Sequence, residues 1–456
     1  MALAPVVAAA QAVVAAVCNP CRYDFSRTNH HRVRWIFTIS PRILLIAQAG
    51  SYRIAPYLDA ARRMGLRVQI ASQGEYSLIS EIHHGLHVDL DDPDSALADI
   101  LAQAQKTPYA GILGSDDSTV ELAARAAAEL DLPHNPPQAA RLTRRKDLAR
   151  AHLAHHGCAV PRHWLIDLDQ ALDPQISGID WPCVIKPLNL SASRGVIRAN
   201  THNEFYAAVA RIRQIIAASS DEFERRHLLV EEYIDGIEIA YEGYLHKGTL
   251  TTLTIFDKPD PLTGPFFAET IYVTPSQLAR NIQDEVIHHV AQACHAYGLT
   301  TGPVHAELRI HEMDSGKTDI RILEIASRTI GGDCARSLDQ GDFNLEELTL
   351  ALAMGKTLEV PPATEARGVM MIPVTQGGVL RRVEGLSAAR NVPHVERVDI
   401  LIREGHELVP LPEGNQYPGY IFARADTPQA VVKALREAHA ELNFVVAPVI
   451  HLQYDP

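Results

Sequence analysis

Hydrophobic and polar positions follow two different periods in the first third of the chain. Short apolar runs at 42–47, 68–71 and 111–113 have the length of strands, and the segments after them, such as Ile54–Met64, have helical spacing. Strands that alternate with helices predict βαβ units and a parallel sheet. Gly50, Gly65 and Gly74 do not form the dinucleotide fingerprint, so the pattern favours a scaffold that shapes one wall of a cleft.

A segment rich in proline and asparagine, 132–137, ends this region and indicates a domain boundary. Beyond it, Thr143 is expected to cap a helix over 144–156, which Gly157 ends. On this helix His152, His155 and His156 share one face, at the spacing of a metal site. Histidines also suit the negative end of a helix, and that interpretation is favoured.

The middle of the chain alternates predicted strands with few helices. Strands are expected at 183–185, 196–199, 228–234 and 237–245, and a helix at 203–218 has Asn203 as its N-cap. A long helix, 277–297, precedes two strands, 304–311 and 319–325, which a polar turn joins into a β-hairpin. The composition changes near Gly377, and the remaining residues are expected to form a small lobe with a helix at 428–442.

Composition narrows the functional classes. With 456 residues the chain is expected to form two or three domains. Lysine and arginine number 42 against 55 acidic residues, and the net charge of −13 disfavours a nucleic-acid partner. Six scattered cysteines fit a reducing, cytoplasmic location.

The start of the chain is unlike the rest. The alanine- and valine-rich run at 2–17 has no basic residue before it and is too short for a membrane span, so neither a signal peptide nor a membrane anchor is expected. Residues 1–40 are expected to be a disordered or mis-started extension. Cys18 and Cys21 form a lone CxxC there, which is weak evidence for a metal or redox site.

The first chemical candidate is Lys186, which follows an apolar strand and precedes a loop of small residues at 189–195. In that loop Ser191, Ser193 and Gly195 leave backbone N–H groups free to surround phosphate oxygens. A lysine at a strand end and a Ser/Gly turn are each common. Together they predict a cover for phosphate groups.

The next candidate is the segment 228–238, where an apolar strand delivers Glu231 and a turn at Gly236 is followed by Glu238. A carboxylate at such a bend suits the hydroxyls of a ribose, and backbone groups near Tyr233 suit the edge of an adenine. The alternative is an exposed edge strand that carries acidic side chains.

The strongest physical argument concerns Glu307 and Glu324, which lie in the two strands of the predicted hairpin. Two carboxylates brought together in a partly desolvated site need a cation between them, and magnesium beside nucleotide phosphates is the usual solution. The planar side chain of Arg328 suits a phosphoryl group or a substrate carboxylate. A surface hairpin with salt bridges is less favoured, because apolar residues flank Glu324.

Five runs occur together in one order: VIKP, LLVEEYIDGIE, FFAETIYVTP, GPVHAELRI and LEIASRTIGGD. With them the chain resembles the ATP-grasp superfamily and, within it, the L-amino acid ligase branch. The resemblance covers roughly 42–445 and is specific in 181–336. It implies an α/β and α+β architecture with a Rossmann-like pre-ATP-grasp domain at 41–137, an ATP-grasp domain at 138–375 and a C-terminal lobe at 376–456.

The resemblance also implies roles for individual residues. ATP phosphates would be held by Lys146 and Lys186 under the loop with Ser191, Ser193 and Gly195. The same resemblance implies that the adenine and ribose would contact Glu231, Tyr233, Ile234 and Glu238. It also implies that Glu307 and Glu324 would bind Mg²⁺ (or Mn²⁺). Substrates would meet Glu269, which receives an amine, with Tyr272, Arg328, Gly331 and Gly332. The catalytic residues would be Lys186 and Arg328, and Arg328 would stabilise the acyl phosphate. In this chain Tyr272 replaces a frequent histidine of the branch, and Ala326 a frequent asparagine ligand of the superfamily.

The implied activity is an ATP-dependent carboxylate–amine ligase that acts through an acyl phosphate, releases ADP and phosphate, and uses small-molecule, amino acid substrates. Assembly as a homodimer is an open possibility. A biotin carboxylase-like enzyme that uses carboxyphosphate is the alternative, and the amine-receiving segment around Glu269 argues against it. A nucleotide-binding module without chemistry is disfavoured by the retention of Glu307, Glu324 and Arg328.

Overall fold

The computed structural model describes residues 40–74, 85–313 and 317–449. The chain divides into two units, Met1–Thr38 and Ile39–Pro456, and everything described here belongs to the second. The predicted extension and its pair of cysteines lie outside the described residues. Within the described part of the chain, no helix has the length and apolar character needed to cross a bilayer.

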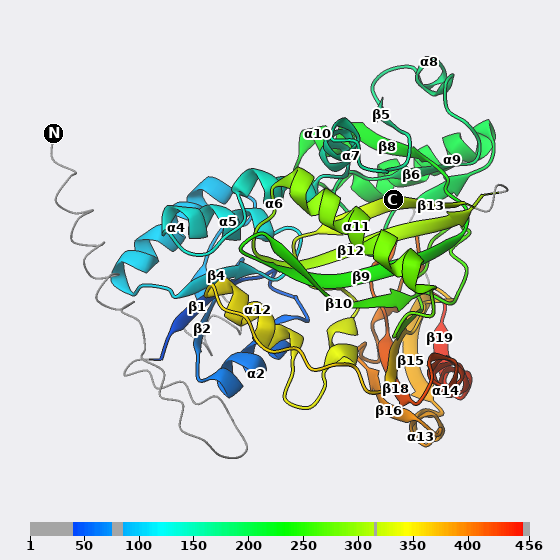
Figure 1. The fold of residues 1–456 in the computed structure, drawn as a ribbon. Coiled ribbons are helices and arrows are strands. Elements are labelled where there is room, and N and C mark those ends of the chain that lie inside the picture. Colours follow the sequence, from blue (N-terminus) through cyan, green and yellow to red (C-terminus); the bar gives the residue numbers. More distant parts are fainter. Residues whose placement is uncertain (1–39, 75–84, 314–316, 450–456) are drawn as a thin grey trace, which may run out of the picture. The chain divides into compact units, whose positions relative to one another are not determined.

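A parallel sheet opens the described chain and confirms the predicted βαβ pattern (Figure 1). Its strand order is β3-β2-β1-β4, with β1 Arg42–Ile46, β2 Arg67–Ser72, β3 Leu86–His87 and β4 Gly111–Gly114. One face packs on α4 Pro93–Lys106 and α5 Val120–Glu129, and the other on α2 Ile54–Met64 and the distant α12 Leu345–Ala353. Because parallel strands end at one edge, the segments after β1 and β4 meet there.

The helix predicted over 144–156 is confirmed as α7 Lys146–His155, but it begins two residues later than expected, and a separate helix, α6 Pro137–Arg144, precedes it. They are separated at Arg145, whose backbone is extended. Thr143 is therefore not an N-cap: it lies inside α6, where its hydroxyl bonds to Ala140 O at 2.8 Å. The break starts a new helix at Lys146, whose N–H donates to Leu188 O at 3.0 Å.

The predicted histidine face lies at the C-terminal end of α7. There His156 Nδ1 is 2.8 Å from the carbonyl oxygen of His152. His152 Nε2 in turn contacts Ala296 O at 2.7 Å. These contacts to carbonyl oxygens agree with the interpretation of a helix end.

A small antiparallel sheet follows, with the order β5-β8-β6-β7. Its strands are β5 His163–Asp167, β6 Cys183–Lys186, β7 Ile197–Ala199 and β8 His227–Glu232, and the helices beside it are α8 Leu172–Ile176, α9 His202–Ile216 and α10 Glu222–Arg226. Phe205, Val209, Ile212 and Ile216 of α9 are buried against the sheet, as their spacing predicts. The predicted cap is wrong: Thr201, not Asn203, caps α9, and its hydroxyl accepts from Glu204 N.

An eight-stranded sheet forms the largest layer, with the order β13-β12-β9-β10-β11-β14-β18-β16. Its strands are β9 Ile237–His246, β10 Thr249–Asp257, β11 Ile271–Thr274, β12 Gly302–Glu312, β13 Thr318–Ala326, β14 Ala366–Met371, β16 Val395–Ile400 and β18 Gly419–Ala425. The long helix α11 Arg280–Tyr297 packs on it. The antiparallel pairing of β12 with β13 confirms the hairpin, whose tip at 314–316 lies outside the described residues.

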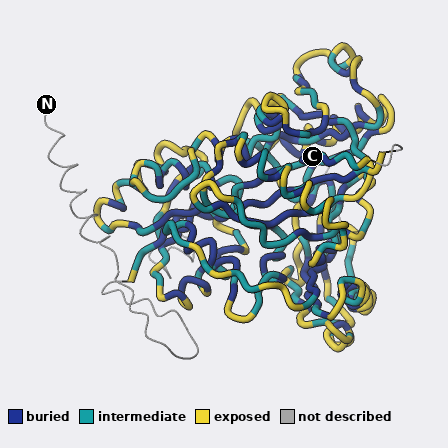
Figure 2. Tube along the Cα trace, in the orientation of Figure 1, coloured by how far each residue is buried: buried dark blue, intermediate teal, exposed yellow. Residues whose placement is uncertain are grey.

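The C-terminal residues contribute to this same sheet through β16 and β18, and they add a second, smaller one. The smaller sheet has the order β17-β15-β19, with β15 Gly378–Glu384, β17 Glu407–Leu408 and β19 Asn443–Ala447. The remaining helices are η1 Cys334–Leu338, α13 Leu386–Arg390 and α14 Pro428–Ala440. Figure 2 shows long buried stretches through the middle of the described chain, with exposed residues toward its outer segments. The domain boundaries given above stay predictions.

Candidate active site

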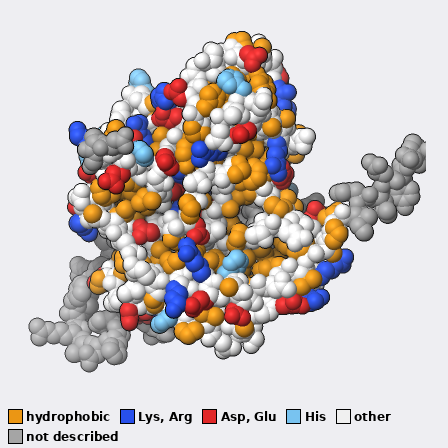
Figure 3. All heavy atoms as spheres, turned by 90° about the vertical axis from the view of Figure 1, so that its right-hand side faces the viewer, with side chains coloured by type: hydrophobic (Ala, Val, Ile, Leu, Met, Phe, Trp, Pro, Cys, Tyr) orange, Lys and Arg blue, Asp and Glu red, His pale blue; other side chains and the backbone are white. Residues whose placement is uncertain are grey.

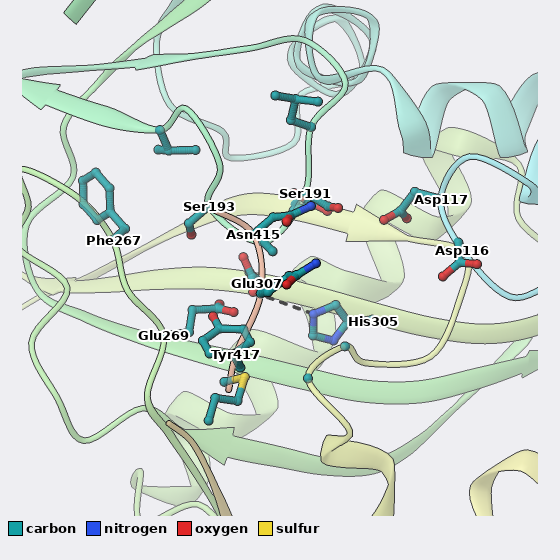
Figure 4. Close-up of a pocket in the computed structure, with 18 of the residues that line it drawn as sticks. Asp116, Asp117, Ser191, Ser193, Phe267, Glu269, His305, Glu307, Asn415 and Tyr417 are labelled. Atoms are coloured by element: carbon teal, nitrogen blue, oxygen red, sulfur yellow. Dashed lines mark ion pairs between the residues drawn. The ribbon is translucent and has the colours of Figure 1, made fainter. Parts of the chain in front are cut away.

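A cavity of about 780 Å³ lies where the parallel sheet, the small sheet and the eight-stranded sheet meet, a size typical of ligand sites. Figure 4 shows side chains from all of these layers turned toward it. Of the predicted site residues, Gly195 alone is not in its wall. The others line it: Lys146, Lys186, Ser191, Ser193, Glu231, Tyr233, Ile234, Glu238, Glu269, Tyr272, Glu307, Glu324, Arg328, Gly331 and Gly332.

The predicted phosphate loop runs from β6 to β7, and three of its residues, Ala192, Ser193 and Gly195, are in left-handed conformation. At Gly195 φ is 72°, and an added Cβ would lie 2.6 Å from Pro187 Cγ, so glycine is strongly favoured there. Its N–H donates to Pro412 O at 2.9 Å. Gly195 therefore ties the loop to the C-terminal residues.

The two predicted phosphate lysines both line the cavity beside this loop. Lys146, the first residue of α7, donates from Nζ to Leu190 O at 2.8 Å. Lys186 ends β6, and its Nζ lies 2.5 Å from Glu231 Oε2. Both ammonium groups are thus held at the cavity by partners of the protein.

Glu231 belongs to a buried ion network. Its other oxygen lies 2.5 Å from Arg150 Nε, and Arg150, itself 2% exposed, also donates to Leu323 O, next to Glu324. Burial opposes ionisation of Glu231, but the positive charges of Arg150 and Lys186 outweigh it and lower its pKa to about 2. The carboxylate that was predicted to contact adenine therefore holds Lys186 in place. Its contact with a nucleotide stays a prediction.

The backbone predicted to read adenine also has protein partners. Tyr233 N donates to Pro182 O at 3.2 Å, and Ile234 O accepts from Arg309 Nη1 at 2.8 Å. The ring of Tyr233 lies 4.0 Å from the guanidinium carbon of Arg198. Adenine contacts from this segment stay a prediction.

Lys258, which the sequence analysis missed, lies at the centre of an acidic cluster. Its Nζ is 2.7 Å from Glu238, 2.8 Å from Glu269 and 3.1 Å from Glu307, and the three acids offer oxygens within 4.8 Å of one another. Burial disfavours the charge on Lys258, but the surrounding carboxylates raise its pKa well above the usual value.

Glu269 is the least acidic member of this cluster. Burial raises the pKa of Glu269, the positive charge of Lys258 lowers it, and the negative charge of Glu307 raises it again. The resulting pKa is about 7. The hydroxyl of Tyr272 donates to Glu269 Oε1 at 2.7 Å. Glu269 can therefore change its charge near neutral pH.

Glu307 and Glu324 are direct partners across β12 and β13, as their alternation predicts, with a bulge immediately after Glu307. The ion pairs of Glu324 are long, 3.6 Å to Lys146 Nζ and 3.9 Å to Arg328 Nη2. Two half-buried carboxylates that face one cavity, one of them with only loose partners, fit a divalent cation as hard oxygen ligands.

Beside the acids, His305 is buried at the wall of the cavity. Its Nδ1 lies 3.2 Å from Glu242, and its Nε2 lies 3.8 Å from Glu307, the ion pair dashed in Figure 4. Burial lowers the pKa of His305, but the bonds to these acids outweigh burial and raise it to about 9.

On the far side of the cavity Arg328 meets the amino-terminal sheet. Its Nε donates to Asp117 Oδ1 at 2.8 Å, in the segment after β4. Burial lowers the pKa of Arg328, but the negative charge of Asp117 outweighs burial, so the pKa is raised. Gly332 lies nearby with φ 61°, and an added Cβ would lie 2.3 Å from Met371 Sδ. The left-handed backbone and this close approach together favour glycine there.

Some of the missed residues had a signal in the sequence and others had none. Lys258 follows the strand Ile255–Phe256–Asp257 and precedes proline, the same pattern as Lys186. By contrast Arg53, Asp117 and Tyr417 come from segments far from the motifs, and only the fold brings them to the cavity.

Comparisons with known proteins agree with this arrangement. Family models described as ATP-grasp N-terminal domain, ATP-grasp domain and L-amino acid ligase C-terminal domain 2 match residues 58–134, 179–337 and 370–447, in that order. The chain belongs to the ATP-grasp superfamily, in its L-amino acid ligase-like branch. The predicted family and fold class are thereby confirmed.

Relatives of this ATP-grasp chain include human carnosine synthase 1, 24% identical over 346 residues, which cover 71% of this chain and 41% of that protein. Alanine–anticapsin ligase of Bacillus subtilis is 23% identical over 60% of this chain and 61% of that one. The chain thus spans about two fifths of the length of the carnosine synthases that it matches.

Solved structures show the same fold. An L-amino acid ligase from Bacillus licheniformis has a TM-score of 0.75 at 24% identity and covers 90% of this chain and 99% of that one. A biotin carboxylase domain from Hydrogenobacter thermophilus, in complex with magnesium ADP, has a TM-score of 0.62 at 15% identity and covers 88% of this chain and 90% of that one. ATP-grasp enzymes generally use ATP with divalent metal ions.

Proposed function

We propose that this ATP-grasp protein is a carboxylate–amine ligase that forms an amide between small molecules, with amino acids as substrates and with ADP and phosphate as products. The observation that supports it best is the convergence on one cavity of Lys146, Lys186, Glu307, Glu324 and Arg328, which are the cations and acids that such a reaction needs. These charged side chains come from different layers of the fold and line the same cavity.

ATP with Mg²⁺ would supply the phosphoryl group and neutralise its charge, and Mn²⁺ is expected to substitute. Lys146 and Lys186 would hold the phosphates from two sides, under the loop with Ser191 and Ser193. The network of Arg150 and Glu231 keeps the Lys186 ammonium at the cavity without reorganisation, as electrostatic stabilisation of a transition state requires.

Arg328 would orient the carboxylate that is phosphorylated to an acyl phosphate. Its guanidinium keeps donors besides the bond to Asp117, so it can also bind an anionic oxygen. Glu269 would receive the amine. Glu269 Oε1 lies 2.8 Å from Lys258 Nζ. The ammonium group of the substrate and Lys258 would therefore share the cluster of Glu238, Glu269 and Glu307.

The proposed partners are a small carboxylic acid and an amine. On the face drawn in Figure 3, basic and acidic side chains are interspersed, and no broad basic stripe of the kind that binds nucleic acid is drawn there. Assembly as a homodimer and a cytoplasmic location remain predictions.

The first experiment is a screen of amino acid pairs for ATP-dependent phosphate release. Its positive pairs are then repeated with oxygen-18 in the carboxylic substrate, and the phosphate is weighed by mass spectrometry. An acyl phosphate transfers one labelled oxygen to each phosphate, with an equal amount of amide and of ADP. Unlabelled phosphate accompanied by amide would exclude direct phosphorylation of the carboxylate. Bicarbonate-dependent phosphate release without amide would instead support a carboxylase.

A further inference from the structure

The segment Arg328–Gly332 leaves β13 and forms one wall of the cavity. Two buried, ionisable side chains from different layers hold its backbone. Glu242 of β9 accepts from Ile330 N at 3.1 Å and is completely buried. From the other side, Arg53 donates from Nη1 to Thr329 Oγ1 at 2.6 Å, and from Nη2 to Thr329 O at 3.2 Å and Ile330 O at 3.0 Å.

Burying the charged guanidinium of Arg53 at this position costs desolvation free energy. It is 8% exposed, and its ion pair with Asp116 is long, at 3.8 Å. Its hydrogen bonds go instead to neutral oxygens of one segment, those of Thr329 and Ile330. A buried charge is rarely the most stabilising choice, since an apolar side chain of similar volume is often as stable or more so. Stability alone does not account for this guanidinium.

The amino-terminal sheet also holds the side chain of Arg328. The adjacent residues Asp116 and Asp117 follow β4, the first beside Arg53 and the second bonded to Arg328 Nε at 2.8 Å. Figure 4 draws both acids at the side of the cavity away from Glu269. The amino-terminal lobe thus holds the segment at two points. Arg53 binds Thr329 and Ile330, and Asp117 binds the side chain of Arg328.

We propose that Arg53 is a positioning residue for the carboxylate-activating step, and that it acts by holding the backbone beside Arg328. The inference rests on the proposed function only for the identity of that step. Although Arg53 lines the cavity, its hydrogen bonds go to Thr329 and Ile330, so we expect its loss to affect the carboxylate more than ATP.

The kinetic test compares Arg53→Met and Arg53→Lys with the control Arg62→Met. Arg62 lies in α2, the helix that Arg53 immediately precedes, and its side chain is 75% exposed. For Arg53→Met we expect kcat/KM for the carboxylic substrate to fall roughly ten- to a hundredfold, while the Kd for ATP changes less than about twofold. Arg53→Lys keeps the charge but not the fork of donors, so it should recover part of the loss. Arg62→Met should behave as the wild type. Equal losses for ATP and carboxylate would overturn the proposal.

A double-mutant cycle tests the contact itself. Thr329→Val removes the hydroxyl that accepts from Arg53 but keeps the carbonyl. Its effect should be smaller in the Arg53→Lys background than in the wild type, because the two residues act through one contact. Strictly additive effects would argue against coupling.

Hydrogen–deuterium exchange separates this proposal from the proposed function. Exchange in peptides that cover 328–332 should accelerate in Arg53→Lys and Arg53→Met but not in Arg62→Met, whatever the substrates are. If the wild type releases no phosphate with any acid, the proposed function fails, and the exchange result still decides whether Arg53 holds the segment. Unchanged exchange in folded Arg53 variants would overturn it. If Arg53→Met does not fold, Arg53→Lys and Thr329→Val carry the same comparison.

Discussion

Replacing Lys258 by methionine should expose the repulsion that this lysine suppresses. The change keeps the length of the side chain and removes the ammonium, which lies 2.7–3.1 Å from Glu238, Glu269 and Glu307. Only 3% of the Lys258 side chain is exposed, so water provides little screening. The three acids, whose oxygens lie within 4.8 Å of one another, would then have no shared counter-ion.

The expected loss follows from this geometry. Removing one partner of a buried ion pair costs about 3–5 kcal/mol. The loss should not triple with three acids, because Arg309 still lies 3.1 Å from Glu238 and the other acids can take up protons. We therefore expect the free energy of unfolding to fall by about 3–5 kcal/mol above neutral pH.

The pH dependence has a definite sign. Burial raises the pKa of Glu269 from 4.5 to about 7 in the folded protein, so its neutral form stabilises the fold below pH 4.5, and that stability is lost as the pH rises through 7. Without Lys258 the pKa of each acid in the cluster should rise further. The deficit of Lys258→Met should thus be small near pH 5 and reach its full size above pH 7.

Urea unfolding at a series of pH values measures this deficit. The control is Lys433→Met, because the Lys433 side chain is 74% exposed and a surface change of this kind should stay within about 0.5 kcal/mol. Mn²⁺ should stabilise Lys258→Met more than the wild type, since the metal can take the place of the ammonium. A deficit below about 1 kcal/mol, or one that does not vary with pH, would refute the reasoning.

Three further variants test the proposed roles. Glu324→Gln should remain folded but lose most turnover, because one metal carboxylate is worth several kcal/mol in the transition state; near wild-type phosphate release in Mg²⁺ would contradict this. Lys186→Ala should weaken ATP binding and turnover together, which calorimetry and steady-state rates measure, and unchanged values for both would make Lys186 a merely structural residue. Glu269→Ala should raise KM for the amine roughly ten- to a hundredfold and leave KM for ATP nearly constant; a parallel rise in both would remove its assignment to the amine.

The sequence by itself determined the layers and one side of the site. Strand-length apolar runs predicted the parallel sheet, and alternation in the hairpin predicted that Glu307 and Glu324 face each other, which their pairing confirms. These features follow from local periodicity, which sequence carries directly. Local signals failed where a longer-range contact decides the backbone, as at Arg145, where α6 ends and α7 begins two residues later than predicted, so that Lys146 meets the phosphate loop.

The tertiary structure alone decided how the charges are paired. Nothing local relates Lys258 to Glu238, Glu269 and Glu307, or Arg53 to Thr329, which is 276 residues away. Such pairs form because separate layers bury the groups together, and a buried charge is stable only where a partner from another layer meets it. The sequence could name which residue types were available for catalysis, but packing between the layers determined which of them share the cavity.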